Sequence, residues 1–487
     1  MHSLYTLVCL VSVAIVASLS TQVAAGAIRE PHRELLTRRF DPLNPFYGTN
    51  TDYPIPSQDP FYEVPSNVSS YSPGGIIRVR KVPTTIFGPE TKSAYQLLYR
   101  TNSQGQPDAT VATVIAPNNV ASGKPKIVAV APPSNAGSID CAPSYVYIPG
   151  SKSNNTLEVV GLLTPSIAVH QGWYAVIPDF EGPQAKWLVG EVEGPALLDS
   201  IRAIMNHKDT IPDATGAMSV LNGYSGGGHT SAWGAQLAST YAPELNIVGA
   251  VAGGLPANLQ KTFDYLDGTS AAGLLLTAVS GVSKGYPDVN SEVNSRLKPG
   301  NWTDAYKLSS TGDLCATIAY KYGAINVTQG FTLDDQGRSI EYSSAVQNAF
   351  DQENLGAHQP PITKIPLYVA HSRTDELIEY QQARDWADSQ CSQGATLEFD
   401  SLSSGVHILT GILAQPTFTR QMQGFFYNAE NNVKLSGSCK FNEVQGGQYP
   451  PFNDVLSGLL GPTAYALIQK VKNSGRDQRI SRRSWQA

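Results

Sequence analysis

Short apolar runs, rich in β-branched residues and bounded by glycine, proline or asparagine, recur through the first half of the chain. They occupy residues 94–101, 109–117, 126–133 and 173–182. Runs of this length and composition are typical of buried strands. The sequence therefore predicts that the folded part of the chain begins with a sheet.

Helical spacing follows in the next segment. Apolar residues fall on one helix face in PALLDSIRAIMNH, residues 195–207, and a stretch of small residues at 228–242 predicts a second helix. Strand-like runs at 218–224 and 246–254 flank that second helix. Strands that alternate with helices indicate a parallel sheet covered on both faces.

This alternation stops after Gly254. Residues 258–359 show no clear strand but contain short apolar helical pieces such as SAAGLLLTAVSGV, so we expect an inserted, mainly helical cap. Strand-like runs resume at Ile365 and Ala395, and a helix is expected from Ile408. The prediction is an α/β fold with a mostly parallel sheet, whose core comprises residues 40–257 and 360–440.

The ends of the chain are expected to lie outside this core. Residues 1–25 form an apolar run that ends in V-A-A, which we interpret as a signal peptide, and a dibasic pair predicts a pro-segment at 26–39. Proline-rich residues 40–75 should run extended over the surface. Residues 441–487 form a C-terminal segment whose basic end is interpreted as a solvated tail, with a flap as the alternative for the part before it.

The composition of the chain argues against two features, a nucleic-acid partner and a transmembrane segment. The 487 residues are 15% charged and 41% apolar, with a formal net charge of -6. Because binding of phosphate backbones needs a concentration of Lys and Arg, nucleic acid is not an expected partner. We expect no transmembrane segment in the mature chain, since the N-terminal apolar run is short and ends in small residues.

Cysteine and asparagine patterns favour secretion. Cys9 lies in the signal peptide, and the others form an even set without zinc-site spacing: Cys141, Cys315, Cys391 and Cys439. Four cysteines allow three pairings, among which spacing does not choose. Four Asn-x-Ser/Thr sequons are candidate glycosylation sites: Asn67, Asn154, Asn301 and Asn326.

The stretch LNGYSGGGHTSAW, residues 221–233, carries the first candidate chemistry. Ser225 lies between a predicted strand and a predicted helix, flanked by Gly223, Tyr224, Gly226 and Gly227. A strained turn of this kind exposes a serine hydroxyl, and the glycines leave room for the close backbone crossing. We interpret Ser225 as a nucleophile.

Two alternatives to this interpretation are disfavoured. GVSKG, residues 281–285, fits the same Gly-x-Ser-x-Gly pattern, but a helical piece precedes Ser283 and Pro287 follows it. A phosphate-binding loop would need the G-x-G-x-x-G spacing or a Lys directly after the glycines of GYSGGG, and neither is present.

Acyl transfer also needs an imidazole and a carboxylate, which in the α/β-hydrolase order follow the serine. After Ile365 the histidines are His371 and His407, and only His407 follows the carboxylate candidates. Asp375, 32 residues earlier, lies in a loop after a strand, where α/β sites collect. The adjacent Glu376 is an alternative that the residue types do not separate from Asp375.

The oxyanion formed by attack on an ester needs backbone N–H donors. One would be the N–H of Gly226, directly after the nucleophile, and the other would come from residues 134–137, after the strand at 126–133. This chemistry needs no metal and no organic cofactor.

These residues together resemble the fungal secretory lipase family. The resemblance rests on GYSGGGHTSAWGAQLASTYAPELNIVGAVAGGLP, IDCAPSY, GWYAVIPDFEGP and the Asp-Glu of RTDELIEYQQA, and it extends from about Phe61 to past Cys439. It implies an α/β-hydrolase fold with a helical lid inserted after the strand that follows the serine turn. Carried over position by position, Ser225 matches the nucleophile, Asp375 the acid and His407 the base.

The same resemblance implies disulfides between Cys141 and Cys315 and between Cys391 and Cys439. It also implies Asn135 as the second oxyanion residue, at a position where the lipase pattern has Asp. A backbone N–H is the donor, so the hole is retained, but the charge beside the developing oxyanion is changed.

The function implied is a secreted serine lipase that hydrolyses triacylglycerols through an acyl-enzyme intermediate, with a lipid–water interface as the candidate place of action. The alternative within the family is a secreted carboxylesterase or deacetylase acting on a smaller ester, such as an acetylated trichothecene-type metabolite. A peptidase is disfavoured because the sequence offers no acidic anchor for a peptide amine. A non-enzymatic binding protein is disfavoured because every triad element is present.

Overall fold

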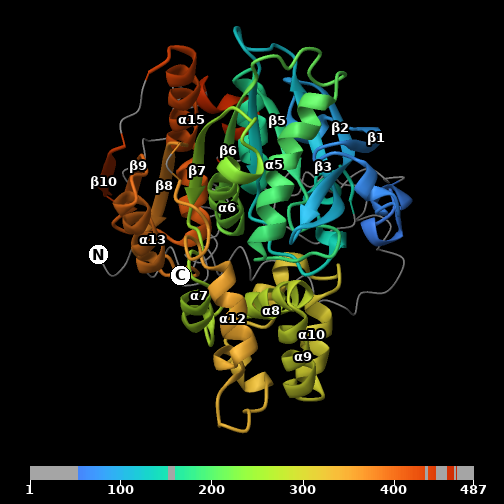
Figure 1. The fold of residues 1–487 in the computed structure, drawn as a ribbon, viewed down its shortest axis with the longest axis vertical. Helices are drawn as coiled ribbons and strands as arrows, with labels where there is room; N and C mark the ends of the chain where they lie inside the picture. Colours follow the sequence, from blue (N-terminus) through green and yellow to red (C-terminus); the bar gives the residue numbers. More distant parts are fainter. Residues whose placement is uncertain are drawn as a thin grey trace, which may run out of the picture.

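The computed structural model describes residues 53–151, 160–362, 364–433, 437–445, 458–465 and 468. These residues build a sheet with the strand order β1-β2-β3-β5-β4-β6-β7-β8-β9-β10 (Figure 1). Its strands are β1 (Ile76–Val82), β2 (Thr91–Ser103), β3 (Gln106–Pro117), β4 (Lys126–Ala131), β5 (Tyr174–Pro178), β6 (Met218–Tyr224), β7 (Ile247–Gly253), β8 (Leu367–Ser372), β9 (Leu397–Leu402) and β10 (Cys439–Val444). β1 to β3 and the β3–β5 pair are antiparallel, and the pairs from β5 to β10 are parallel. The predicted mostly parallel sheet is confirmed.

The helices fall between these strands. They are α3 (Pro143–Val146), α4 (Leu163–His170), α5 (Gly190–Asn206), α6 (Gly226–Tyr241), α7 (Leu259–Leu266), α8 (Gly273–Gly285), α9 (Pro287–Arg296), α10 (Asn301–Ser309), α11 (Ile318–Lys321), α12 (Ser344–Glu353), α13 (Tyr380–Ser392), α14 (His407–Leu413) and α15 (Gln415–Glu430). Short 3-10 turns join them: η2 (Pro56–Gln58), η3 (Pro60–Tyr62), η4 (Val68–Ser70), η5 (Thr85–Phe87), η6 (Ile139–Cys141), η8 (Cys315–Thr317), η9 (Val327–Gly330) and η10 (Ile340–Tyr342).

Each face of the sheet packs against its own set of helices, because successive side chains of a strand point to opposite faces. In β4, Ile127 and Ala129 belong to the apolar core that includes Trp233 of α6. Val128 of the same strand belongs to a separate core that includes Phe418 of α15. The central strands are therefore buried on both sides, which explains why their sequences are continuously apolar.

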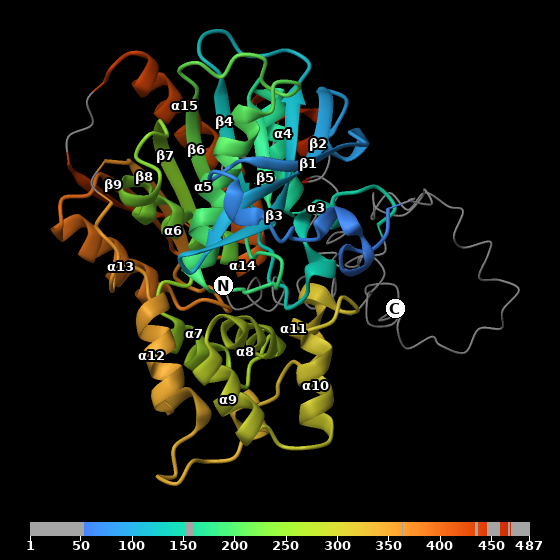
Figure 2. The ribbon, with the colours of Figure 1, turned by 45° about the vertical axis from the view of Figure 1, so that its right-hand side comes forward.

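The helices α7 to α12 lie between β7 and β8 in the chain and form a layer beside one end of the sheet (Figures 1 and 2). They have their own apolar core, which includes Phe263, Leu275 and Phe350. Leu188 and Leu377 join this core from loops of the sheet region. The cap therefore packs directly on the loops that follow strands of the sheet.

Some elements differ from the sequence prediction. The proline-rich stretch before residue 75 contains η2 to η4, because prolines at positions 56 and 60 start 3-10 turns. β10 crosses the boundary expected at residue 440, and Leu460 and Ala464 pack against Ile412 of α14. The signal peptide (1–25), the pro-segment (26–39) and the basic end of the tail lie outside the described residues.

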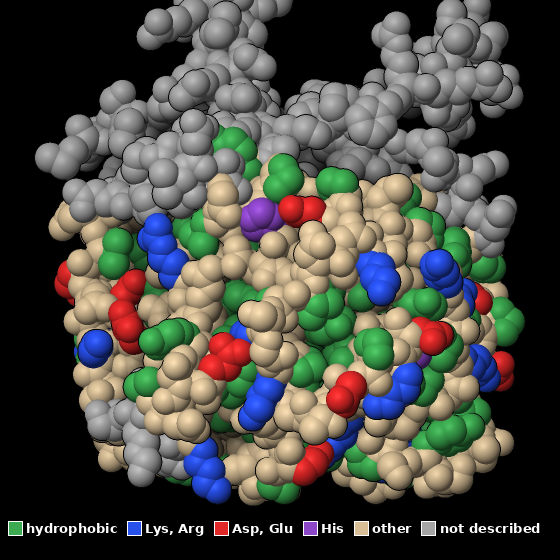
Figure 3. All heavy atoms as spheres, turned by 90° about the horizontal axis from the view of Figure 1, so that it is seen from above, with side chains coloured by type: hydrophobic (Ala, Val, Ile, Leu, Met, Phe, Trp, Pro, Cys, Tyr) green, Lys and Arg blue, Asp and Glu red, His purple; other side chains and the backbone are tan. Residues whose placement is uncertain are grey.

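The face of the molecule opposite the cap carries acidic and basic side chains interspersed with one another (Figure 3). Within the described ranges, no helix has both the length and the apolar character needed to cross a membrane. The same ranges contain no group of three or more His, Cys, Asp or Glu side chains arranged to hold a metal ion.

Candidate active site

Ser225 stands on a sharp turn between β6 and α6. Its backbone angles are φ 60° and ψ -128°, a conformation that costs energy in a residue with a side chain. The turn requires glycines: a Cβ on Gly223 would lie 1.9 Å from the carbonyl oxygen of Gly227, and one on Gly227 would lie 1.9 Å from that of Ala131. This is the geometry of a nucleophile elbow.

The second Gly-x-Ser-x-Gly has no such geometry. Ser283 lies inside α8, and its side chain is buried among the cap helices. A serine within a regular helix cannot present its hydroxyl at a strand-to-helix turn, so only Ser225 has the predicted context.

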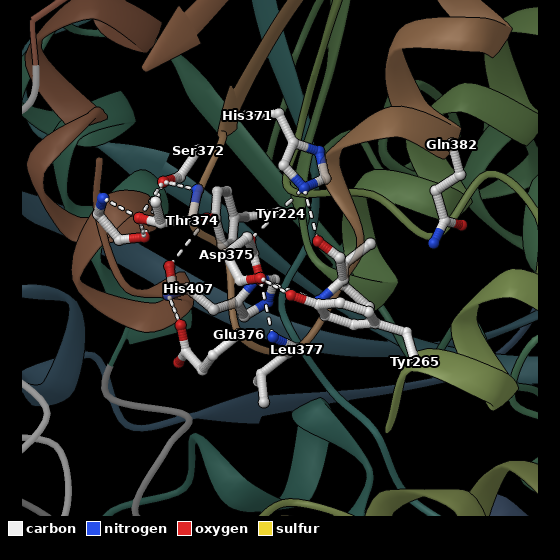
Figure 4. A network of polar contacts seen from close by, with 12 residues as sticks. Tyr224, Tyr265, His371, Ser372, Thr374, Asp375, Glu376, Leu377, Gln382 and His407 are labelled. Carbon is white, nitrogen blue, oxygen red and sulfur yellow. Dashed lines mark hydrogen bonds and ion pairs between the residues drawn. The ribbon is translucent and has the colours of Figure 1, made fainter. Parts of the chain in front are cut away.

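Asp375 and His407 meet in a buried hydrogen bond. His407 Nδ1 donates to Asp375 Oδ2 over 2.6 Å (Figure 4). Asp375 Oδ1 accepts the backbone N–H groups of Leu377 and Ile378, over 3.0 Å and 2.9 Å. These bonds hold the carboxylate in one orientation toward the imidazole.

The two groups stabilise each other's charged forms. Burial alone raises the pKa of Asp375, but the charge and hydrogen bond of His407 outweigh this and lower it. Burial lowers the pKa of His407, but the attraction and hydrogen bond of Asp375, together with the charge of Glu376, raise it above its ordinary value. The site therefore favours the imidazolium–carboxylate pair that forms when an imidazole acts as a base.

The imidazole lies against the elbow. Tyr224, the residue before Ser225, donates its hydroxyl to the backbone oxygen of His407 over 2.8 Å, and the two rings are 5.0 Å apart. The imidazole also lies close to the end of β7, because a Cβ on Gly254 would be 3.1 Å from His407 Cε1. The preceding residue, Gly253, accepts the backbone N–H of Ser225. His407 Nε2 is buried and has no hydrogen-bond partner among the described residues. This ring nitrogen is thus free to receive a proton.

The residue types did not separate Asp375 from Glu376, whereas the family resemblance favoured Asp375, and the geometry distinguishes the two. Glu376 Oε2 accepts the backbone N–H of His407 over 2.8 Å and makes no bond to the ring. Sequence reasoning placed His407 in a loop, whereas it is the first residue of α14. Glu376 therefore fixes the start of that helix, while Asp375 bonds the imidazole.

Two contacts to the Asp375 loop were missed by sequence reasoning. His371 Nε2 lies 3.1 Å from the backbone oxygen of Ile378 and 3.5 Å from Asp375 Oδ2, and burial lowers its pKa. Tyr265 of α7 donates its hydroxyl to the backbone oxygen of Asp375 over 2.8 Å (Figure 4). The contact between His371 and Asp375 joins residues four apart, but the Tyr265 contact joins a cap helix to a loop 110 residues away, which no local pattern reveals.

Asn135 lies beside Gly226. The point where a Cβ would stand on Gly226 is 2.7 Å from Asn135 Oδ1 and 3.1 Å from the backbone oxygen of Ser134. The loop is held on both sides: Ala136 N donates to Glu181 over 3.2 Å, and Lys284 of α8 donates to the oxygen of Gly137 over 2.5 Å. The two predicted oxyanion residues are therefore neighbours in space.

Two disulfides brace this arrangement. Cys141, shortly after the Asn135 loop, is bonded to Cys315 in the cap, and Cys391 of α13 is bonded to Cys439 of β10. Of the sequons, Asn67, Asn301 and Asn326 are exposed, whereas Asn154 lies outside the described residues.

An apolar pocket lies in the cap, and one of its lining residues comes from the loop between β5 and α5. Its lining includes Leu188, Leu275, Val279, Val293, Ile340 and Phe350. Leu188 follows Trp187 in the chain, and the ring nitrogen of Trp187 lies 2.9 Å from the Cβ position of Gly226. The lining residue Leu188 is thus the neighbour in the chain of Trp187, whose side chain lies against Gly226.

A serine elbow after a parallel strand, with an acid and a base after later strands, defines an α/β-hydrolase. Comparisons with known proteins identify the family: residues 152–430 match the secretory lipase family. The chain belongs to this family and is a carboxylic ester hydrolase.

Among its relatives, lipase A of Moesziomyces aphidis is 35% identical over 410 residues, which cover 82% of this chain and 84% of the relative. A secreted triacylglycerol lipase of Malassezia furfur is 30% identical over 440 residues, covering 86% of this chain and 87% of the relative. The X-ray structure of Candida antarctica lipase A in its closed state has a TM-score of 0.74 at 30% identity, covering 86% of this chain and 96% of that chain.

Proposed function

We propose that this protein is a secreted triacylglycerol lipase that uses Ser225, His407 and Asp375 as a catalytic triad. The observation that carries the proposal is the buried 2.6 Å hydrogen bond between Asp375 and His407, with the imidazole lying against the elbow residue Tyr224. The free Nε2 of His407 is the atom that would accept the serine proton.

In the proposed reaction, Ser225 Oγ adds to the ester carbonyl carbon while His407 Nε2 takes its proton. The backbone N–H groups of Gly226 and Asn135 stabilise the oxyanion. His407 then protonates the leaving alcohol, which departs and leaves an acyl-enzyme. Water, deprotonated by His407, releases the fatty acid and restores Ser225.

A triacylglycerol substrate is supported by the cap and by the relatives. The cap pocket lined by Leu188 and Phe350 has apolar walls, the kind of surface that contacts acyl chains. Relatives at 30% identity include a secreted triacylglycerol lipase. Secretion is supported by the two disulfides, because such bonds persist in oxidising compartments.

The test of the triad is the replacement Ser225→Ala. Loss of the nucleophile should lower kcat about 10³-fold or more, with an unchanged unfolding midpoint, because one oxygen and no core volume is removed. The matched control is Ser283→Ala in the second Gly-x-Ser-x-Gly, which should retain activity. An active Ser225→Ala enzyme would contradict the proposal.

The substrate class needs a separate comparison. Rates on a long-chain triacylglycerol emulsion and on short soluble acetates should be measured with the same preparation. Turnover of the emulsion supports a lipase. Turnover of acetates alone would indicate the esterase or deacetylase alternative and would not contradict the proposed triad.

A further inference from the structure

Trp187 carries a buried donor that the proposed mechanism does not use. The residue lies in the loop between β5 and α5 and is only 6% exposed. Its Nε1 is buried and has no hydrogen-bond partner among the described residues. A buried indole N–H usually has a partner, because an unpaired one has lost its hydrogen bond to water without replacing it. An unpaired donor at this position therefore requires an explanation.

The position of this N–H relates it to the oxyanion hole. Trp187 Nε1 lies 2.9 Å from the Cβ position of Gly226, the residue after Ser225. Asn135 Oδ1 lies 2.7 Å from the same point and is likewise unpaired, although the two atoms form no hydrogen bond with each other. Both side chains therefore lie against Gly226, whose backbone N–H is the first proposed oxyanion donor, and of the two atoms only the indole nitrogen carries a proton to donate.

The loop holds Trp187 in place at a cost in backbone energy. Ala185 and Leu188, on either side of it, have positive φ angles of 53° and 64°. Non-glycine residues keep this conformation only where their surroundings impose it, and such residues cluster at functional sites. Leu188 N is also fixed by a 2.7 Å bond to Glu193.

The cap completes this support through the second Gly-x-Ser-x-Gly. A Cβ on Gly281 would lie 2.5 Å from the oxygen and 2.7 Å from the nitrogen of Trp187, and one on Gly285 would lie 2.7 Å from the side chain of Val189. The glycines of GVSKG therefore let α8 lie directly on the backbone of the Trp187 loop. This packing holds the backbone from which the indole extends.

We propose that the indole N–H of Trp187 is a third hydrogen-bond donor to the oxyanion, beside the N–H groups of Gly226 and Asn135. The inference rests on the proposed function. When Ser225 Oγ bonds to the carbonyl carbon, the π pair of the C=O bond moves onto oxygen, and the indole donates to that oxygen without transferring its proton. The bond is stronger to an oxyanion than to an ester oxygen, so it raises kcat more than it lowers KM.

The experiment is the kinetics of Trp187→Phe on a soluble p-nitrophenyl ester. The replacement keeps an aromatic ring and removes the N–H, so kcat should fall about tenfold with KM changed less than about twofold. The matched control is Trp386→Phe on α13, where another buried indole N–H lacks a partner away from the elbow. The control should keep its kcat, and both variants should unfold at similar temperatures.

A second variant separates a direct donor from a residue that acts through Asn135. In an Asn135→Ala background the backbone N–H at position 135 remains, and Trp187→Phe should still lower kcat about tenfold. If Trp187→Phe no longer lowered kcat in that background, a direct hydrogen bond from Trp187 to the oxyanion would be contradicted. An unchanged kcat in Trp187→Phe with an inactive Ser225→Ala would overturn the third donor alone, whereas an active Ser225→Ala would overturn the proposed function as well.

Discussion

At the scale of single residues, the Asp375 carboxylate controls how readily His407 takes up a proton. The imidazole is buried, which by itself lowers its pKa, and the carboxylate reverses this effect. In the proposed mechanism the neutral imidazole is the form that accepts the serine proton. Activity should therefore rise with pH through a pKa that lies above the ordinary histidine value.

Replacing Asp375 by Asn tests this relationship. Without the carboxylate, burial dominates, so the acidic limb of the pH–activity profile should move to lower pH. The maximum rate should fall about 10⁴-fold, because the imidazolium is no longer stabilised and the tautomer is no longer fixed. The measurement is kcat/KM from pH 5 to 9 for both enzymes. A limb that stays at the same pH would show that Asp375 is not the partner of the base.

The residues of this site differ in how far the sequence could predict them. The elbow was predictable because its close backbone crossing leaves no room for a Cβ at Gly223 or Gly227, so the glycines appear in the local sequence. The choice between Asp375 and Glu376 came from the family resemblance and not from the residue types, because two adjacent carboxylates differ only in the direction in which the backbone points them. Trp187 left no signal, since its contact with Gly226 arises only when separate elements pack together.

At the scale of elements, the elbow depends on how closely α6 approaches β4. Gly227→Ala would place a Cβ 1.9 Å from the backbone oxygen of Ala131, and a backbone atom cannot move aside as a side chain can. We expect a loss of about 2–3 kcal/mol in the free energy of unfolding and a lower kcat, since the helix must shift with Ser225 at its start.

The matched control is Gly424→Ala in α15. Its Cβ would meet no atom within 4 Å, so the change should stabilise the protein by about 0.5–1 kcal/mol through helix propensity. Denaturant unfolding of both variants gives the comparison. A Gly227→Ala protein as stable as the control would mean that α6 and β4 leave room for a methyl group at position 227.

Elements also differed in how clearly the sequence predicted them. Central strands such as β4 and β6 were found because both of their faces are buried and their residues are continuously apolar. β1 and β10 were missed because they lie at the sheet edges, where residues such as Arg78, Arg80 and Lys440 alternate with apolar ones. Single edge strands of this kind read as polar loops.

At the scale of the whole molecule, the cap is attached to the core at the loops that carry the site. Lys284 bonds the Asn135 loop, Tyr265 bonds the Asp375 loop, and Cys315 bonds Cys141. A fourth attachment is buried: Glu353 of α12 accepts the backbone N–H of Gly190 over 2.6 Å. The cap is thus positioned by polar bonds as well as by its apolar core.

Glu353 makes this attachment sensitive to pH. It is fully buried, and desolvation raises its pKa to about 8, against hydrogen bonds from Tyr286 and Gly190 that lower it. In the unfolded chain the carboxyl returns to its ordinary value of 4.5. Between these two values the folded state binds the proton more tightly, so this group contributes stability below pH 4.5 that is lost as pH rises to 8.

Glu353→Gln should remove this dependence. The carboxamide cannot ionise, its oxygen can still accept from Gly190, and its amide can donate to Tyr286. The free energy of unfolding should therefore decline less steeply between pH 5 and 8, and the variant should gain up to roughly 4 kcal/mol relative to the parent by pH 8. Exposed Glu63→Gln serves as the control and should keep the parent slope. If both variants decline as the parent does, Glu353 is not protonated in the folded protein, and the cap would then be attached to α5 through an ionised carboxylate.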